Sequence, residues 1–184
     1  MQQSVGVRNA RLQSREDTIG TSPVMKIFGG AAKPADCAAA DAGTVLATLP
    51  LPSDFQAAPS AGAASLAGTW QDASADANGF ARYYRIYNNA VSTCHEQGLC
   101  SQNWVASSPF STGQHVNNGG NVYLCTTGGT SAGSGGPTGT GTGITDGSCV
   151  WSYVGPVDMV LTNTSLAATQ AFSVTQYSLT EGNA

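Results

Sequence analysis

Residues 103–155 read NWVASSPFSTGQHVNNGGNVYLCTTGGTSAGSGGPTGTGTGITDGSCVWSYVG, and this stretch decides how the chain is organised. It has a tryptophan near each end, Trp104 and Trp151, and nine glycines within residues 128–147. Its one charged residue is Asp146. A segment of such unusual composition is typical of a small independent module that has been inserted into a different protein.

The length of the chain allows such a division. Its 184 residues can bury one ordinary core and a second small one. The charge falls and the glycine content rises abruptly after residue 102. We therefore predict a body made of residues 1–102 and 157–184, and a glycine-rich module made of residues 103–156. These two parts are called the body and the insert.

Charge is scarce in the whole chain. Charged residues make up only 10%, whereas an average soluble protein has about 25%. A free monomer normally relies on surface charge for its solubility. We therefore expect neighbouring subunits of an assembly to cover much of this surface.

The charge pattern also excludes some functions. The net charge of −4 and the scattered positions of the seven basic residues argue against nucleic-acid binding, which needs clustered lysine and arginine. No apolar run approaches the ~20 residues of a membrane helix. The first 20 residues lack the apolar core of a secretory signal. We expect no nucleic-acid partner and no membrane partner. The protein is expected either to stay in the cytoplasm where it is made or to leave it by a route that needs no signal, such as cell lysis.

The cysteines leave two interpretations open. There are five, and an odd number cannot pair completely within one chain. Cys125 and Cys149 flank the glycine-rich loop of the insert, residues 128–143. They either close this loop with a disulfide in an oxidising compartment, or act as buried reduced thiols of small apolar character.

No group of residues indicates catalysis. His95 and His115 are the only histidines, and no G-x-S-x-G sequence precedes a helix. The glycine-rich loop lacks the G-x-x-x-x-G-K-[ST] pattern that binds phosphates. Cys94, His95 and Cys100 lack a CxxC or HxxxH pair and a fourth metal ligand. We predict no catalytic residue, no metal and no cofactor.

The body is predicted to consist mostly of β-strands, because short apolar and aromatic runs alternate with Gly, Pro and Asn turns. The predicted strands are Val24–Phe28, Thr44–Leu51, Phe80–Tyr87, Ser92–Gln97, Val157–Thr162 and Ala171–Leu179. For residues 4–19, a short helix, a strand and an extended arm all stay open, since the apolar spacing is thin. Several strands and no convincing long helix predict an all-β fold, with an antiparallel β-sandwich or jelly-roll-like body and a small inserted β-rich module.

The insert is expected at the tip of a hairpin. It interrupts the link between the strand that ends near Leu99 and the strand that starts near Val157. Insertions at hairpin tips cost little, because loop-closure entropy grows slowly with loop length. A body in which a short linker joins Gln102 to Val157 is therefore expected to fold.

Several phrases of the body carry a resemblance to a known family. They are VGVRNARLQSREDTIGTSPVMKIFGG, CAAADAGTVLATLPLPSDF, GTWQDASADANGFARYYRIYNN, TCHEQG and DMVLTNTSLAATQAFSVTQYSLTEGNA. Over residues 4–102 and 157–184 the chain resembles small structural proteins encoded by tailed bacteriophages. The resemblance implies a non-enzymatic virion protein that decorates or stabilises the capsid. A neck, collar or tail component used in host-surface recognition is the alternative.

The resemblance also implies partners and a location. The partners are the major capsid protein and copies of the chain itself, as a homotrimer at a symmetry axis of the capsid. The location is the phage particle, after synthesis in the cytoplasm of the host bacterium. Arg8, Arg11 and Arg15 are the candidate residues of an N-terminal arm that anchors the protein to the shell.

The insert has a second resemblance. Its pattern consists of Trp104, the step Gly113-Gln114-His115-Val116, the run Asn121–Cys125, Pro137, and Asp146-Gly147 followed by Val150-Trp151. This pattern resembles the small chitin-binding modules of carbohydrate-binding families 5 and 12. The long loop of residues 128–143 departs from those compact modules. Two roles therefore stay open for the insert: contact with surface polysaccharide, and a spacer that covers surface.

Sugar binding would use aromatic faces, which stack on the apolar face of a pyranose ring. The candidate carbohydrate-binding residues are Tyr153, Phe110, Trp104, Tyr123 and Trp151. A module of about fifty residues also needs a core. We predict that Trp104, Tyr123 and Trp151 fill this core, and that Tyr153 first and Phe110 second are the candidates for stacking on a ligand.

Overall fold

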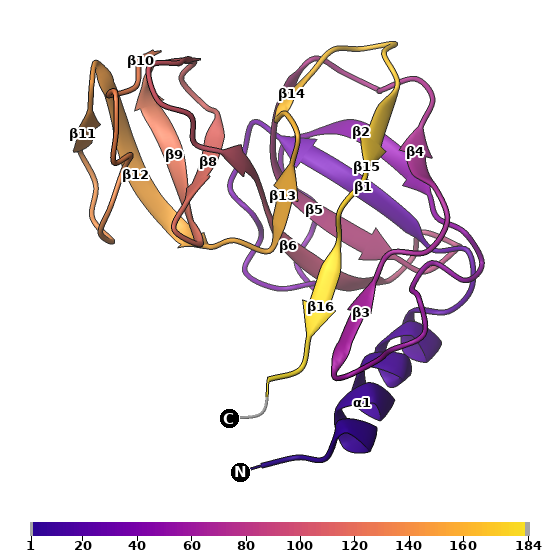
Figure 1. Cartoon of the computed structure of the whole chain (residues 1–184). Helices are drawn as coiled ribbons and strands as arrows, with labels where there is room; N and C mark the ends of the chain where they lie inside the picture. The colour runs from indigo at the N-terminus through magenta and orange to yellow at the C-terminus, as the bar shows by residue number, and fades with distance from the viewer. Residues whose placement is uncertain (1, 183–184) are drawn as a thin grey trace.

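The computed structural model describes residues 2–182 and consists mainly of β-strands and turns. In this described range there is one helix, so the all-β class is confirmed (Figure 1). Ten strands form one mixed sheet, and the others form three two-stranded sheets. The antiparallel β-sandwich or jelly-roll-like body stays a prediction.

The main sheet has the strand order β11-β12-β9-β8-β6-β5-β1-β2, with β13 beside β6 and β14 beside β5. Its body strands are β1 (Val24–Gly29), β2 (Thr44–Pro50), β5 (Gly79–Tyr87), β6 (Cys94–Asn103), β13 (Met159–Leu161) and β14 (Ser165–Leu166). Strands β1, β2 and β5 and the first half of β6 pair antiparallel. Strand β6 is longer than the predicted Ser92–Gln97, because its second half pairs with β13 and β8.

Strand β5 is buried on both of its faces. Successive side chains of a strand point to opposite sides of the sheet. Tyr84 and Ile86 lie in the main hydrophobic cluster. Tyr83 and Arg85 lie on the other face and bond to the connection between β1 and β2. This connection, residues 31–43, is called the covering loop.

Four short strands close the body. Strand β3 (Ala63–Ser65) pairs with β16 (Ser178–Thr180), and β4 (Trp70–Asp72) pairs with β15 (Phe172–Val174). The predicted single strand Ala171–Leu179 is therefore wrong. The chain changes partner at Tyr177, whose ring is buried with its centroid 5.1 Å from that of Trp70.

Residues 5–19 form a helix, α1 (Val5–Ile19), and the expectation of no long helix is wrong. The side chain of Ser4 caps its first turn, and Gly20 ends it with a φ of 86°. Leu12 and Ile19 are the buried apolar residues of the helix. The helix therefore packs on the body and is not an extended arm.

The insert forms the other end of the main sheet. Its strands are β7 (Pro109–Phe110), β8 (His115–Asn118), β9 (Asn121–Thr127), β10 (Gly129–Thr130), β11 (Ile144–Asp146) and β12 (Cys149–Pro156). Two parallel residue pairs, Gln102 with Val116 and Asn103 with Asn117, join β6 to β8. The insert has its own hydrophobic cluster, separate from that of the body. It projects as a lobe beside the body (Figure 1).

The strands on either side of the insert do not form a hairpin. Strands β6 and β13 are parallel, with Met159 opposite Cys100 and Leu161 opposite Gln102. Parallel neighbours need a crossover that brings the chain back to the same end of the sheet. The expectation of a hairpin tip is therefore wrong, and the insert is itself the crossover.

Candidate functional site

The five aromatic residues predicted to bind carbohydrate or to fill the core of the insert lie in one cluster. Phe110, Tyr123 and Trp151 are 5%, 1% and 0% exposed. The rings of Phe110 and Trp151 meet edge-on, with centroids 5.3 Å apart. Core packing is confirmed for Tyr123 and Trp151. Stacking of Phe110 on a ligand is a wrong prediction, because its ring has no open face.

Trp104 and Tyr153 are only partly buried and pack against this cluster. The ring of Tyr153 meets that of Tyr123 edge-on at 5.9 Å. Trp104 has Gly136 against it, where an added Cβ would lie 2.9 Å from Cδ2 of the indole. These two residues are the candidate rings that a ligand can still reach.

Asp146 connects the two tryptophans of the insert. Its carboxylate accepts hydrogen bonds from the indole nitrogen of Trp104 at 2.7 Å and from that of Trp151 at 3.2 Å. It also accepts the backbone N–H of Ala132 at 3.0 Å. Asp146 is buried, so this carboxylate has a structural role that sequence reasoning missed. The sequence signal for this role is that Asp146 is the one charged residue in residues 103–155.

The glycine-rich loop, residues 128–143, is held against the lobe. Every second backbone carbonyl from residue 135 to residue 141 accepts a hydrogen bond from a residue of β8, β9 or β12. The acceptors and donors are Gly135 and Pro137 with Nδ2 of Asn118, Gly139 with the hydroxyl of Tyr123, and Gly141 with the backbone N–H of Tyr153, at 2.9, 3.0, 3.0 and 2.9 Å. This part of the loop is therefore an ordered cover beside the aromatic cluster.

His115 docks the insert on the body. Its Nδ1 lies 3.2 Å from the carbonyl oxygen of Arg82 and 3.1 Å from that of Cys100. Burial lowers the pKa of His115 to about 4, so the ring is neutral at pH 7. Arg82 in turn donates from Nε to the carbonyl of Gly113 at 3.0 Å. This histidine joins strands of the body and the insert through Nδ1.

The arginines of the predicted anchoring arm contact the chain itself. Arg8 donates to the carbonyl of Glu181 at 3.2 Å, and Nη1 of Arg11 lies 3.4 Å from the carboxylate of Glu181. The side chain of Arg11 is 56% exposed. Helix α1 is thus tied to the C-terminal segment, and Arg11 is the more open of the two.

Arg15 belongs to a polar cluster beneath the helix and is not an anchoring residue. It pairs with Glu96 at 2.5 Å and donates to Gln56 at 2.7 Å and to the hydroxyl of Tyr177 at 2.8 Å. The hydroxyl of Tyr84 donates to Glu96 at 2.9 Å. Burial raises the pKa of Tyr84 and of Tyr177, so both hydroxyls keep their protons. The cluster fixes α1 to the sheet.

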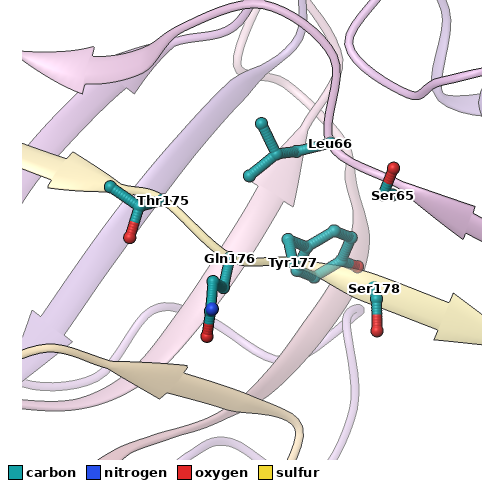
Figure 2. A pocket seen from close by; sticks show the side chains of 6 residues that line it. All are labelled: Ser65, Leu66, Thr175, Gln176, Tyr177 and Ser178. Atoms are coloured by element: carbon teal, nitrogen blue, oxygen red, sulfur yellow. The ribbon is translucent and has the colours of Figure 1, made fainter.

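Two grooves lie where the chain passes from β15 to β16. The first, of about 570 Å³, is lined by Ser65, Leu66, Thr175, Gln176, Tyr177 and Ser178 (Figure 2). The second, of about 370 Å³, shares Thr175 and Gln176 with it and reaches Val105 of the insert. All the side chains that line the two grooves are uncharged. This surface suits a neutral polar partner.

Within residues 2–182, no three His, Cys, Asp or Glu side chains come together in a way that would hold a metal ion. No helix in the same range is long and apolar enough to cross a membrane.

Comparisons of the chain with protein-family models, with curated proteins and with solved structures found no match. The resemblances to phage structural proteins and to chitin-binding modules therefore stay predictions from the sequence.

Proposed function

We propose that this chain is a non-enzymatic structural protein of a tailed-phage virion, which decorates or stabilises the capsid and displays the insert outwards. The observation that carries the proposal is the presence of two separate hydrophobic clusters, one in the body and one in the insert. The insert and helix α1 lie at different ends of the molecule (Figure 1). Such a molecule can attach at one end and present a lobe at the other.

The end that carries α1 has the properties of an attachment surface. Val5 and Val7 are 47% and 48% exposed, and they share the helix with the open side chain of Arg11. Val7 lies one helical turn before Arg11, on the same side of α1, and an exposed apolar residue beside a basic one suits a protein interface. Attachment through this end would cover these valines and bring Arg11 to an acidic neighbour on the capsid.

Purified virions test the proposal. Copy number relative to the major capsid protein, measured on a gel, distinguishes two positions. A number comparable with that of the capsid protein is expected for a decoration protein, whereas a few copies would indicate the neck, collar or tail. Complete absence from virions would overturn the proposal. Light scattering of the purified chain tests the homotrimer.

The attachment surface has its own test. Val5→Ser combined with Val7→Ser should reduce incorporation into virions about tenfold or more, because two apolar contacts are lost. The matched control is Val91→Ser, at a valine 37% exposed in the turn between β5 and β6. Equal incorporation of both variants would show that α1 does not attach the protein.

We further propose that the insert makes weak contacts with neutral surface polysaccharide through Trp104 and Tyr153. The uncharged composition of the insert and the partial exposure of these rings support this role. One or two stacked rings give an affinity of about −4 to −6 kcal/mol, and many copies on one particle would raise the avidity.

Retention of virions on chitin, peptidoglycan and host polysaccharide tests this contact. Tyr153→Ala should lower retention, whereas Val154→Ala, at the exposed neighbouring position, should not. Phe110→Ala is unsuitable as a binding test, because the ring is part of the core. Lack of retention on all three polymers at high valency would favour a spacer.

A further inference from the structure

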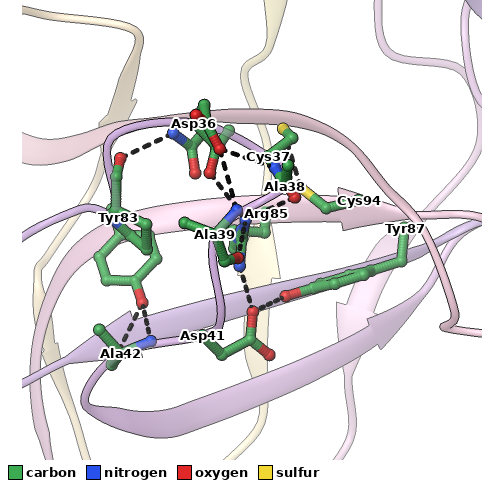
Figure 3. A network of polar contacts seen from close by, with 12 residues as sticks. Asp36, Cys37, Ala38, Ala39, Asp41, Ala42, Tyr83, Arg85, Tyr87 and Cys94 are labelled. Carbon is green, nitrogen blue, oxygen red and sulfur yellow. Dashed lines mark hydrogen bonds and ion pairs between the residues drawn. The ribbon is translucent and has the colours of Figure 1, made fainter.

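The covering loop, residues 31–43, is held by one buried cation. Arg85 is 1% exposed and pairs through Nη1 with the carboxylate of Asp41. Its Nη2 donates to three carbonyls of the covering loop, those of Asp36, Cys37 and Ala39, at 3.1, 3.0 and 3.0 Å. The hydroxyl of Tyr87 also donates to Asp41 (Figure 3). The path of the loop is therefore set independently of its cysteine.

This path brings two thiols together. Cys94 is the first residue of β6 and lies opposite Tyr87 in the register of β5 and β6. Its Sγ lies 2.9 Å from Sγ of Cys37, although the two residues are 57 positions apart in the sequence. Both cysteines are free and half-buried, so a small oxidant can reach them.

The other three cysteines are less accessible to solvent than Cys37 and Cys94. Cys125 and Cys149 are also close to each other, but each is 1% exposed within the core of the insert. Cys100 is 0% exposed. Among the five thiols, only Cys37 and Cys94 combine proximity with access.

We propose that Cys37 and Cys94 form a redox-controlled disulfide site that locks the covering loop onto β6. The inference does not rest on the proposed function. In a reducing compartment the loop is held by hydrogen bonds, chiefly those of Arg85, and in an oxidising one a covalent bond is added between the loop and the sheet.

The oxidant is a small disulfide such as glutathione disulfide. One cysteine thiolate attacks it, forms a mixed disulfide and releases one glutathione thiolate. The second cysteine thiolate attacks the protein sulfur of the mixed disulfide and releases the second glutathione. Two protein thiols are oxidised by two electrons in total, one glutathione disulfide is reduced to two thiols, and the two protons pass to these thiols. Burial raises the pKa of Cys94 to about 12, so the exchange is slow and is measured after equilibration.

The test uses the full chain, purified with reductant and equilibrated in glutathione buffers from fully reduced to oxidised. The number of free thiols should fall from five to three, with a mass loss of two hydrogens. Chymotrypsin can cleave after Leu99, which separates Cys94 from Cys100 in the peptide map. The expected cross-linked peptides contain Cys37 and Cys94. The oxidised form should have a Tm about 5 to 10 °C higher, and hydrogen exchange in the covering loop should slow.

Variants separate this pair from the other close pair. Cys37→Ser and Cys94→Ser should each prevent the loss of two thiols, while their Tm under reductant stays near that of the parent. The matched control, Cys125→Ser with Cys149→Ser, should still lose two thiols. Five free thiols in every buffer, a bond between other cysteines, or a disulfide-linked dimer would each overturn the proposal. If a serine variant does not fold, the peptide map of the parent chain decides.

Discussion

Asp146 shows how much one side chain can determine in a small lobe. Its carboxylate accepts three hydrogen bonds, two of them from the tryptophans near the ends of the insert. A buried carboxylate is costly unless its oxygens are satisfied. With three donors aimed at it, Asp146 holds Trp104 and Trp151 to a common point.

Asp146→Asn should lower the free energy of unfolding of the insert by about 2 to 3 kcal/mol. Both indole N–H groups donate to Oδ2 and the backbone N–H of Ala132 donates to Oδ1, so the amide N–H group of asparagine takes the acceptor from Ala132 or from both tryptophans. Tryptophan fluorescence during denaturation is the measurement, since two of the three tryptophans lie in the insert. Asp54→Asn, at an exposed position, is the control. Equal midpoints for the two variants would contradict the role of Asp146.

At the scale of elements, Arg15 is the side chain that contributes most to holding helix α1 on the body. Arg15 and Glu96 are each 18% exposed and have further partners, whereas Arg11 is 56% exposed in its pair with Glu181. Removal of one partner from a buried pair leaves an uncompensated charge, but exposed pairs contribute little.

Arg15→Gln should therefore destabilise the fold by about 2 to 4 kcal/mol, and Arg11→Gln by at most about 0.5 kcal/mol. Urea unfolding followed by circular dichroism gives both values. The comparison is matched, because both arginines lie on the same helix and receive the same substitution. A similar loss for both variants would mean that the cluster beneath the helix is not what holds α1.

Strand β8 carries a pH-dependent junction. His115 is 3% exposed and contacts carbonyls of β5 and β6. Its folded pKa, about 4, lies below the value of about 6.5 for an unfolded histidine. Between these values the unfolded chain binds a proton that the folded chain does not. This histidine therefore lowers stability as the pH falls from about 6.5 to about 4, and has no such effect above pH 6.5.

The loss over this interval should be at most about 3 kcal/mol from His115. Denaturation at a series of pH values measures it, and His115→Gln should remove this part of the fall. His95→Gln is the control and should keep the fall. Parallel pH profiles for the parent and His115→Gln would show that the junction does not depend on this proton.

At the scale of the whole molecule, the insert is part of the connectivity of the body. Because β6 and β13 are parallel, the chain must return along the length of the strand before β13 can pair. The insert provides this return and adds four strands to one end of the main sheet.

A deletion of residues 103–156 should therefore depend on the length of the replacing linker. A link of two or three residues between Gln102 and Val157 should prevent β13 from pairing beside Cys100, whereas a flexible link of about a dozen residues should allow a folded body. Circular dichroism and thermal unfolding of the two deletion chains make the comparison. A folded chain with the short link would contradict the parallel arrangement.

The sequence alone was sufficient for features that depend on local periodicity and composition. The apolar and aromatic run Phe80–Tyr87 predicted a strand, and the glycine content marked the insert. The thin apolar spacing of residues 4–19 does not distinguish a helix from a strand or an arm, whereas Ser4 and Gly20, which cap α1, are local signals of a helix.

Only the tertiary structure decided which distant segments are partners. The parallel pairing of β6 with β13, the contact of Arg15 with Glu96, and the approach of Cys37 to Cys94 all join residues far apart in the chain. Local patterns show which faces of a segment are apolar, but they do not select among several compatible partners. That choice depends on packing all segments together, and here it selected a docked helix from the three alternatives for residues 4–19 and replaced an expected hairpin tip by a crossover.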